Sequence, residues 1–231
     1  MSVLSVEASG KFLSLAFERD GSVRTSRTRM NNDLCETLIG KIGEVSNGDI
    51  SDLSEILVGD GPGSFTSLRI AFSTVKGLAL ALDIPVRRIG VLSLMALGYA
   101  DSLGSDGFFG IMVPISDARK KRLYYAVFSH DGRQLVKPGD KAFDDIAHEL
   151  NSVFPDASGI TFVTDDDALN PDLPSVFGNR AKLVISDANL AEVMLRHRSE
   201  SRMLERFQGP TYVRLPDAEE NVARRRTQSG S

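Results

Sequence analysis

The sequence contains a single cysteine, Cys35, and no tryptophan among its 231 residues. One cysteine excludes a disulfide within the chain, which fits a reducing compartment. No apolar run approaches the roughly 20 residues that a bilayer-spanning helix needs. The start of the chain, Met1–Ser5, has no basic segment and no apolar core, so we expect no signal peptide. These absences predict a cytoplasmic protein without membrane contact.

A strong excess of charge of either sign is also missing. The formal net charge of −4 argues against non-specific nucleic-acid binding by the whole surface. With 42% hydrophobic and 25% charged residues, the composition is that of an ordinary globular chain. A length of 231 residues allows one large domain or two small ones.

Zinc and nucleophile motifs are absent as well. The histidines, His130, His148 and His197, lie far apart in the sequence. His148 begins an H-E-x-x-H pattern, but Ser152 stands where the second histidine belongs. Cys35 has no histidine close to it in sequence that would activate it as a nucleophile. We therefore expect no metal site and no catalytic residue.

A glycine-rich stretch organises the rest of the chain. It lies between a predicted buried strand, Ile56–Val58, and a helix predicted from Ser64 to Leu82, capped by Ser64 or Thr66. A loop before a helix N-terminus offers backbone N–H groups to an anion. The spacings of the P-loop, the dinucleotide loop and the nucleophile elbow are all missing, so a tight structural turn is favoured, with direct phosphate contact as the alternative. The loop residues are Gly59, Gly61, Pro62, Gly63 and Ser64.

The predicted Ser64–Leu82 helix has two faces of different character. One face is bulky and apolar and suits the chain's own core: Phe65, Leu68, Phe72, Val75, Ala79 and Leu82. The other face is small and would let another helix approach closely: Ala71, Thr74, Gly77 and Ala81. The preceding predicted helix, which ends near Val45, carries the apolar stripe Leu34, Leu38, Ile42 and Val45.

The order of predicted elements indicates two halves. Each half starts with strand, turn, strand, turn, strand and continues with helices mixed with strands, which is a weak internal repeat. The segment Gly104–Gly107 is the predicted boundary, which gives an N-terminal half at residues 1–104 and a C-terminal half at residues 105–215. A last helix is predicted from Asn189 to Phe207, and the polar tail at 216–231 is predicted to be disordered. Such an order predicts mixed sheets with helices on their faces.

Three motifs carry a resemblance to a known family. Gly59–Ala71 reads G-D-G-P-G-S-F-T-S-L-R-I-A and is very similar to the G-x-G-P-G-S-F-T-G-L-R-I-G signature of the TsaB (YeaZ) family. Asp117–Arg119 resembles the D-A-R of that family, and Pro210–Arg214 resembles its P-x-Y-x-R motif. The resemblance implies the α/β fold of actin, Hsp70 and the sugar kinases, which is ribonuclease H-like in each half.

The resemblance also implies a function. The family supports synthesis of threonylcarbamoyladenosine on tRNA, at the adenosine beside the anticodon, and is similar to a degenerate copy of the catalytic subunit TsaD. It implies a non-catalytic subunit that pairs with TsaD through the N-terminal halves, activates it and joins TsaE, with tRNA reached through the complex. ATP and Mg²⁺ would be used by the complex, with no cofactor in this chain. The sequence leaves the oligomeric state in isolation open, with a homodimer as one alternative. The predicted partner interface is Ala71, Thr74, Gly77, Ala81, Leu34 and Leu38.

Two departures from the family pattern leave alternatives open. Glu7-Ala8 stands where relatives read I-D-T-S, and Asn31–Asp33 stands where relatives begin a helix with H-S-E. The turn after Glu7 has only one glycine, Gly10, so it offers phosphate few backbone donors. The alternative functions are a self-sufficient ATP-binding phosphotransferase or a peptidase of the same fold, and a tRNA-binding module. The candidate nucleotide or tRNA contacts are Glu7, Arg119, Lys120, Lys121 and Arg122, and the tail run Arg224–Arg226 is a further candidate for tRNA phosphates.

Overall fold

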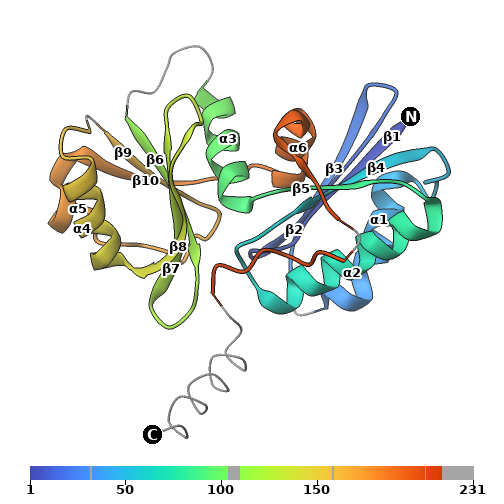
Figure 1. Cartoon of the computed structure of the whole chain (residues 1–231), viewed down its shortest axis with the longest axis horizontal. Helices are drawn as coiled ribbons and strands as arrows, with labels where there is room; N and C mark the ends of the chain where they lie inside the picture. Colours follow the sequence, from blue (N-terminus) through green and yellow to red (C-terminus); the bar gives the residue numbers. More distant parts are fainter. Residues whose placement is uncertain (32, 104–109, 158, 206, 215–231) are drawn as a thin grey trace, which may run out of the picture.

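The computed structural model describes residues 1–31, 33–103, 110–157, 159–205 and 207–214. Within them one order of elements, β-β-β-α-β-α-β-α, occurs twice (Figure 1), so the repeat expected from the sequence is present. The first copy comprises β1 (Ser2–Glu7), β2 (Phe12–Arg19), β3 (Ser22–Arg29), α1 (Leu34–Ser46), β4 (Leu53–Gly59), α2 (Phe65–Leu82), β5 (Val86–Ile89) and α3 (Val91–Leu103). The second comprises β6 (Ile111–Asp117), β7 (Arg122–Ser129), β8 (Gln134–Ala142), α4 (Phe143–Val153), β9 (Ile160–Thr164), α5 (Leu173–Phe177), β10 (Ala181–Ile185) and α6 (Leu190–Arg196). A short strand β11 (Arg202–Met203) follows.

Each copy contributes one mixed sheet. The first sheet has the order β11-β5-β4-β1-β2-β3 and the second the order β10-β9-β6-β7-β8. In both, three antiparallel strands are followed along the chain by two strands that run parallel to the first of them. In the first sheet β11 is added at the edge, antiparallel to β5. The turn between β2 and β3 is made by Asp20 and Gly21, which both have positive φ, as the Asp-Gly pair predicts for a two-residue hairpin. The predicted α/β fold with mixed sheets flanked by helices is confirmed.

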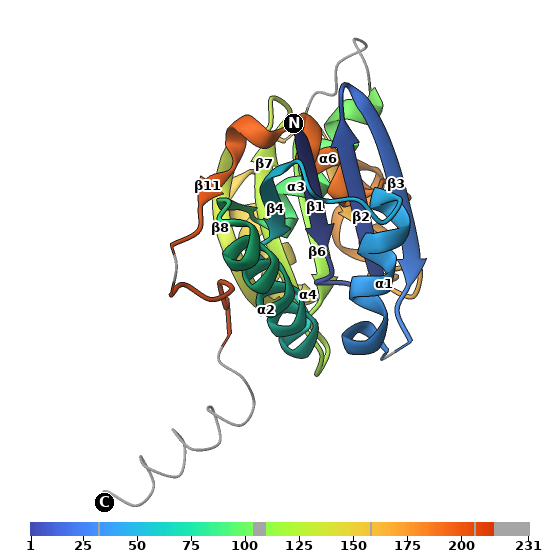
Figure 2. The same cartoon turned by 90° about the vertical axis from the view of Figure 1, so that its right-hand side faces the viewer.

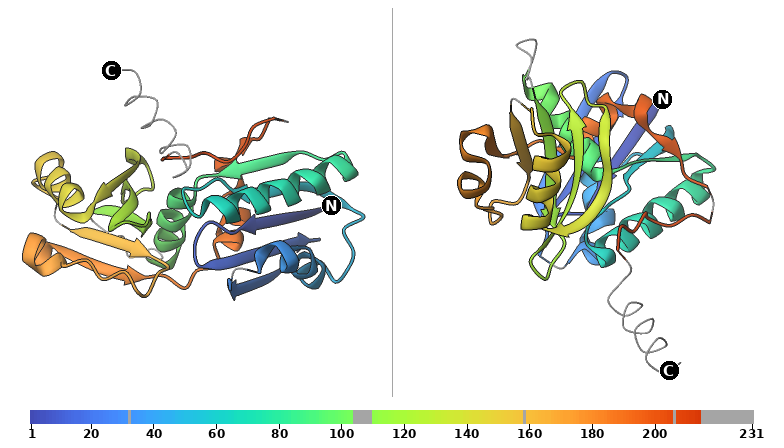
Figure 3. Two further views of the ribbon diagram at one scale, coloured as in Figure 1. Left: turned by 90° about the horizontal axis from the view of Figure 1, so that it is seen from below. Right: turned by 60° about the vertical axis from the view of Figure 1, so that its left-hand side comes forward.

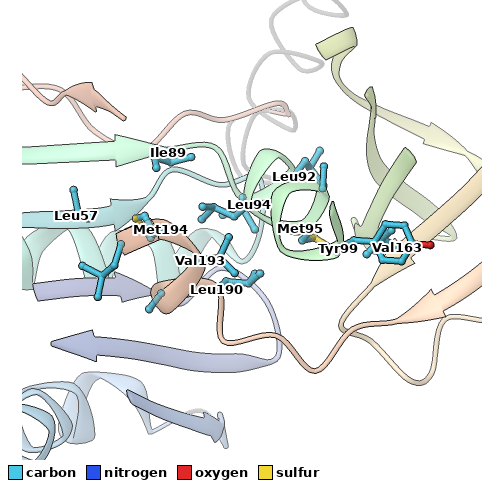
Figure 4. Close-up of a cluster of buried hydrophobic side chains, with 14 of the residues drawn as sticks. Leu57, Ile89, Leu92, Leu94, Met95, Tyr99, Val163, Leu190, Val193 and Met194 are labelled. Atoms are coloured by element: carbon cyan, nitrogen blue, oxygen red, sulfur yellow. The ribbon is translucent and has the colours of Figure 1, made fainter. Parts of the chain in front are cut away.

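Helices cover both faces of the first sheet. The helices α1 and α2 lie side by side on one face (Figure 2). Leu38, Ile42, Phe72 and Val75 from their apolar stripes are buried there in one cluster with residues of β1, β2 and β4. The other face is covered by α6, which contacts β1 to β4, and α6 in turn packs against α3 (Figure 3). The helix α3 contacts β6, β7 and β9 of the second sheet. Figure 4 shows this shared core, in which side chains of α3 and α6 gather between strands of both sheets. The two halves are therefore joined by a continuous apolar core.

Among the described residues, α2 is the one helix that is long and apolar enough, by length and composition, to cross a membrane. Its residues Leu68, Phe72 and Val75 are buried inside the chain, as expected of a helix that packs on a sheet.

The end of the chain differs from the prediction. The helix expected from Asn189 to Phe207 ends at Arg196, and β11 then pairs antiparallel with β5. Arg87 of β5 donates to the hydroxyl and the carbonyl of Ser201, which fixes this extended segment on the first sheet. Since α6 also packs on β1 and β2, part of the predicted C-terminal half, 105–215, lies on the N-terminal half. The predicted boundary at Gly104–Gly107 and the tail at 216–231 lie outside the described residues.

Candidate functional site

A cleft of about 470 Å³ lies where the two halves meet. Its walls come from the turn after β1, the loop before α2, the hairpin tip after β6 and the loop after β9. These segments meet because β1 and β4 run parallel in one sheet and β6 and β9 run parallel in the other. The carboxyl ends of parallel strands are the usual place for ligand sites in α/β folds, so this cleft is the candidate ligand site.

The three sequence motifs meet at this cleft. They are joined by the last described segment, Gln208–Arg214, which we call the C-terminal strap and which runs along α2 toward the second half (Figure 1). Asp60 accepts hydrogen bonds from the Thr211 backbone N–H and hydroxyl, both at 2.9 Å. The rings of Phe65 and Tyr212 pack with their centroids 4.9 Å apart. The glycine loop and the P-x-Y-x-R motif are therefore direct neighbours.

Arg214 ties the strap to the second half. Its guanidinium donates to the carbonyl of Ala118 at 3.3 Å and lies 3.5 Å from the carboxylate of Asp140. Ala118 is the central residue of the D-A-R motif, so all three motifs are connected through one short segment. At the other end of the strap, the Lys76 ammonium on α2 donates to the Gln208 carbonyl at 2.9 Å.

The glycine loop is locked to the first hairpin. The Ser64 N–H donates to the Ser9 carbonyl at 2.8 Å, and a Cβ on Gly63 would lie 2.4 Å from that same oxygen. Gly61 has φ +63°, which glycine adopts without strain. Ser64 caps α2 as predicted, since its hydroxyl accepts from the Ser67 N–H. These contacts favour the structural-turn interpretation, because the backbones of the two loops occupy the space between them.

Glu7 lies behind this pair of loops and does not line the cleft. Its side chain is 2% exposed, and its carboxylate accepts from the Ser9 N–H at 2.6 Å. Burial raises the pKa of Glu7 to about 7. Burial also raises the pKa of Asp165, which does line the cleft. Gly59 leaves the room that the Glu7 side chain needs, because a Cβ there would lie 2.8 Å from the Glu7 Cγ.

The four cationic residues that were predicted to contact a nucleotide or tRNA differ in their surroundings. Arg122 forms an ion pair with Asp140 at 2.6 Å. Arg119, Lys120 and Lys121 are exposed at the hairpin tip, and all three have positive φ, at 65°, 55° and 58°. The Asp117 side chain accepts from the Arg119 N–H at 2.8 Å and holds the turn. Arg119 lines the cleft.

The predicted partner interface needs a correction. Leu34, Leu38 and Ala71 are at most 4% exposed and belong to the chain's own core, so they are not available to a partner. The helical period of these residues was predicted correctly, but the side of each helix that they define faces the chain's own sheet. Of the remaining predicted residues, Gly77 and Ala81 are exposed and Thr74 is half-buried.

Two exposed apolar side chains complete this surface, and the sequence prediction missed both. Ile39 of α1 is 56% exposed and Leu80 of α2 is 70% exposed. We use the name α1–α2 face for the exposed small and apolar residues of these two helices, Cys35, Ile39, Gly77, Leu80 and Ala81. The two helices contact each other and lie on the same side of the first sheet (Figure 2). The sequence did contain a signal for both residues, because Ile39 and Leu80 are large apolar residues that lie outside the core-facing stripe of their helices.

The histidines do not come together. His197 pairs with Asp101 at 2.9 Å, whereas His130 and His148 are exposed. In the part of the chain that the structure describes, no three His, Cys, Asp or Glu side chains are grouped in a way that could hold a metal ion.

Comparison with known proteins gives consistent matches. A family model described as TsaD, tRNA N6-adenosine threonylcarbamoyltransferase, matches residues 29–194, more than two thirds of the chain. Curated relatives include the tRNA threonylcarbamoyladenosine biosynthesis proteins TsaB of Escherichia coli (26% identical, 57% of this chain) and Bacillus subtilis (29% identical, 56% of this chain). The match spans 56% of the length of each. The structure of YeaZ from Pseudomonas aeruginosa has the same fold, with a TM-score of 0.68 at 20% identity over 91% of this chain and 99% of that one.

Proposed function

The chain belongs to the family described as TsaD, tRNA N6-adenosine threonylcarbamoyltransferase, and we propose that it acts in tRNA threonylcarbamoyladenosine biosynthesis, the process named for its TsaB relatives. Its part in that process is a non-catalytic one. It forms a heterodimer with TsaD and holds the catalytic subunit in its active shape.

The observation that carries this proposal is the α1–α2 face. Large apolar side chains on a monomer surface cost free energy in water and often mark an interface. Ile39 and Leu80 supply the apolar contact, and Gly77, which has open space around its Cα, lets a partner helix approach. This combination of small and apolar residues suits helices of a second protein of the same fold.

The loops at the cleft support the proposal that this chain is not itself catalytic. The Ser9-Gly10 turn and the Gly63-Ser64 loop are joined backbone to backbone by a 2.8 Å hydrogen bond. A phosphate between them would have to displace that contact. We therefore assign ATP and Mg²⁺ to the complex rather than to this chain, with TsaE and tRNA as further members. In isolation the same face would pair two copies of this chain.

The experiment is to mix the purified chain with TsaD of the same organism and to measure the mass of the product by light scattering. A one-to-one species is expected for the wild type. Leu80→Arg should weaken the association at least about tenfold, because it places a charge in the apolar contact. The matched control is Ile185→Arg, which changes a side chain of similar exposure, 53%, on β10. Two unassociated wild-type proteins, or equal loss in both variants, would contradict the interface.

A second measurement separates a subunit from a self-sufficient enzyme. Calorimetry of the isolated chain with millimolar ATP and Mg²⁺ should show no binding heat. Saturable binding that Glu7→Gln or a cleft variant such as Asp165→Asn abolishes would favour the phosphotransferase alternative instead.

A further inference from the structure

We propose that the groove between the two halves is a peptide-binding groove, and that the chain's own C-terminal strap occupies it as a detachable ligand. When the strap is released, the groove takes an extended segment of another protein. That segment offers the same groups in the same order, namely a hydroxyl, an aromatic ring, an apolar side chain and a cation. The inference goes beyond the proposed function, because it does not involve the α1–α2 face.

The strap separates two cavities. Tyr212 and Arg214 line the cleft of about 470 Å³, whereas Thr211 and Val213 line a second cavity of about 610 Å³. Successive side chains of an extended chain point to opposite sides, which explains this alternation. Gly61 lets the strap pass closely, because a Cβ there would lie 3.1 Å from the Thr211 carbonyl oxygen. Removal of the strap would therefore join the two cavities into one groove.

The groove supplies a separate contact for each kind of side chain on the strap. A carboxylate accepts from the hydroxyl, an aromatic ring packs on the aromatic ring, and a second carboxylate and a carbonyl receive the guanidinium. Val213 is half-buried in the wall of the second cavity, which Ile89, Leu97 and Phe128 also line. Extended peptides are commonly recognised in this way, through pockets for alternate side chains.

Side chains, rather than a sheet, hold the strap in place. Within the described residues, no backbone-to-backbone hydrogen bond joins residues 208–214 to either sheet, and none of these residues is fully buried. The segment just before the strap is different, because β11 pairs with β5 and the Leu204 N–H donates to the Val86 carbonyl at 2.9 Å. Segments with few buried contacts open locally at a lower free energy than the whole fold. The strap can therefore leave while β11 stays in place.

The two carboxylates that hold the strap keep a cation when the strap leaves. Asp60 lies 3.2 Å from Arg88, and Asp140 lies 2.6 Å from Arg122. An uncompensated buried charge is strongly unfavourable. Because each carboxylate has this second partner, release of the strap leaves neither of them unpaired.

The charges along the cleft favour a cation at the position of Arg214. Without Arg214, two cations and three carboxylates line the cleft. They are Lys11, Arg119, Asp117, Asp165 and Asp166. The other two lysines of the hairpin tip do not line the cleft, and Asp140 beside it is matched by Arg122. A peptide with a cation at this position restores the balance of charge, whereas a carboxylate there would add to the negative excess.

The test uses full-length chains and a fluorescein-labelled peptide with the sequence of Gln208–Arg214, whose binding is followed by fluorescence anisotropy. The strap variant carries Tyr212→Ala and Arg214→Gln, which weaken the tethered strap and leave the other side of the groove unchanged. The groove variant carries Asp60→Asn in addition to these two changes.

A matched control for the strap variant carries Val153→Ala and Arg180→Gln. These two changes also remove apolar surface and one positive charge, but both residues are exposed on the second half and line neither cavity. A second peptide, with the same two replacements as the strap variant, tests whether the ring and the guanidinium are recognised.

We expect the wild type and the control to bind the peptide weakly, because the tethered strap competes at a high effective concentration. The strap variant should bind it at least about tenfold more tightly, since a larger fraction of its grooves is open. The groove variant should lose most of this gain, and the altered peptide should bind none of the chains. A strap with a purely structural role would give no gain in binding when it is weakened.

Hydrogen exchange of the wild type supplies a second measurement, which needs no variant and stands even if the strap variant does not fold. The Thr211 amide should exchange at least about a hundredfold faster than the amides of Leu4 and Val6 in β1, because it opens locally. Low concentrations of urea should leave its rate unchanged, since a local opening exposes little surface.

The proposal is overturned if a folded strap variant binds the peptide no better than the wild type, if both peptides bind equally well, or if Asp60→Asn has no effect. It is also overturned if the Thr211 amide exchanges only with the whole fold, at a rate that rises with urea as the rates in β1 do. A wild-type dimer that the strap variant loses, measured by light scattering, would mean that two copies exchange their straps and would contradict the assignment to another protein.

Discussion

At the scale of single residues, the surroundings of a glycine decide whether its replacement by alanine lowers or raises stability, as Gly63 and Gly77 show. A Cβ on Gly63 would lie 2.4 Å from the Ser9 carbonyl oxygen, whereas a Cβ on Gly77 would have no heavy atom within 4 Å. Gly63→Ala should therefore lower the free energy of unfolding by about 3 kcal/mol, because a backbone must shift. Gly77→Ala should raise it by up to about 1 kcal/mol, the difference in helix propensity.

Urea denaturation of the two variants checks this pair. Equal effects, or a stabilising Gly63→Ala, would mean that the glycine loop is not locked to the Ser9-Gly10 turn.

Glu7 predicts a pH dependence of stability. Its pKa rises from 4.5 to about 7 on folding, chiefly because it is buried. Between these values the unfolded chain releases a proton that the folded chain keeps, so stability falls as pH rises through this window. Glu7→Gln removes this dependence, because glutamine does not titrate. The free energy of unfolding of the variant, relative to that of the wild type, should therefore rise by roughly 3 kcal/mol from pH 4 to pH 8, at 1.36 kcal/mol for each pKa unit.

The measurement is the free energy of unfolding of both proteins at several pH values in this range. Asp165→Asn is a useful second variant, because burial raises the pKa of that carboxyl too. Parallel curves for the wild type and Glu7→Gln would contradict the buried, protonated state of Glu7.

At the scale of elements, the C-terminal strap depends on Asp60. Its carboxylate accepts twice from Thr211 and lies 3.2 Å from Arg88, and its side chain is only 12% exposed. Asp60→Ala should cost about 2 kcal/mol, because Arg88 and the Thr211 N–H lose their acceptor together. Hydrogen exchange at the Thr211 amide should speed up accordingly.

The control is Asp49→Ala, which removes a carboxylate that is 54% exposed and paired with Arg19. Surface pairs of that kind contribute little to stability, so exchange at the Thr211 amide should remain as slow as in the wild type. If Thr211 exchanges equally slowly in the wild type and Asp60→Ala, the strap is held by other contacts.

Local patterns predicted most of the elements. The glycine loop, the Ser64 cap and the 3.6-residue period defined α2, and the Asp-Gly turn defined the β2–β3 hairpin. Period alone does not say whether an apolar stripe meets the chain's own sheet or a partner, which is why Leu34, Leu38 and Ala71 were placed at the wrong surface. The place where the strap docks could not be predicted, because the Asp60–Thr211 contact joins residues 151 positions apart.

The last helix was overextended for a related reason. Residues after Arg196 retain some helical pattern, but pairing of β11 with β5 and the contacts of Arg87 override it. Tertiary contacts commonly decide such short segments.

At the scale of the whole molecule, two copies of one pattern share the core built from α3 and α6 (Figure 4). Lys11 of the first half pairs with Asp166 of the second, and Arg214 reaches Ala118 and Asp140. These contacts fix the cleft on one side of the molecule, and the strap links it to α2, which carries part of the α1–α2 face. The helix α2 therefore connects the two sites, since its first residue, Phe65, lines the cleft and Leu80 near its other end belongs to the α1–α2 face.

The measurement that tests the central claim most directly is the rate of threonylcarbamoyladenosine formation on tRNA by TsaD with its substrate-supplying and ATP-hydrolysing partners, with and without this chain. We predict that formation requires the wild-type chain, that Ile185→Arg supports it fully, and that Leu80→Arg supports it only at concentrations raised to offset its weaker association. TsaD that modifies tRNA equally well without the chain, or full activation by a Leu80→Arg chain that does not bind TsaD, would contradict the account.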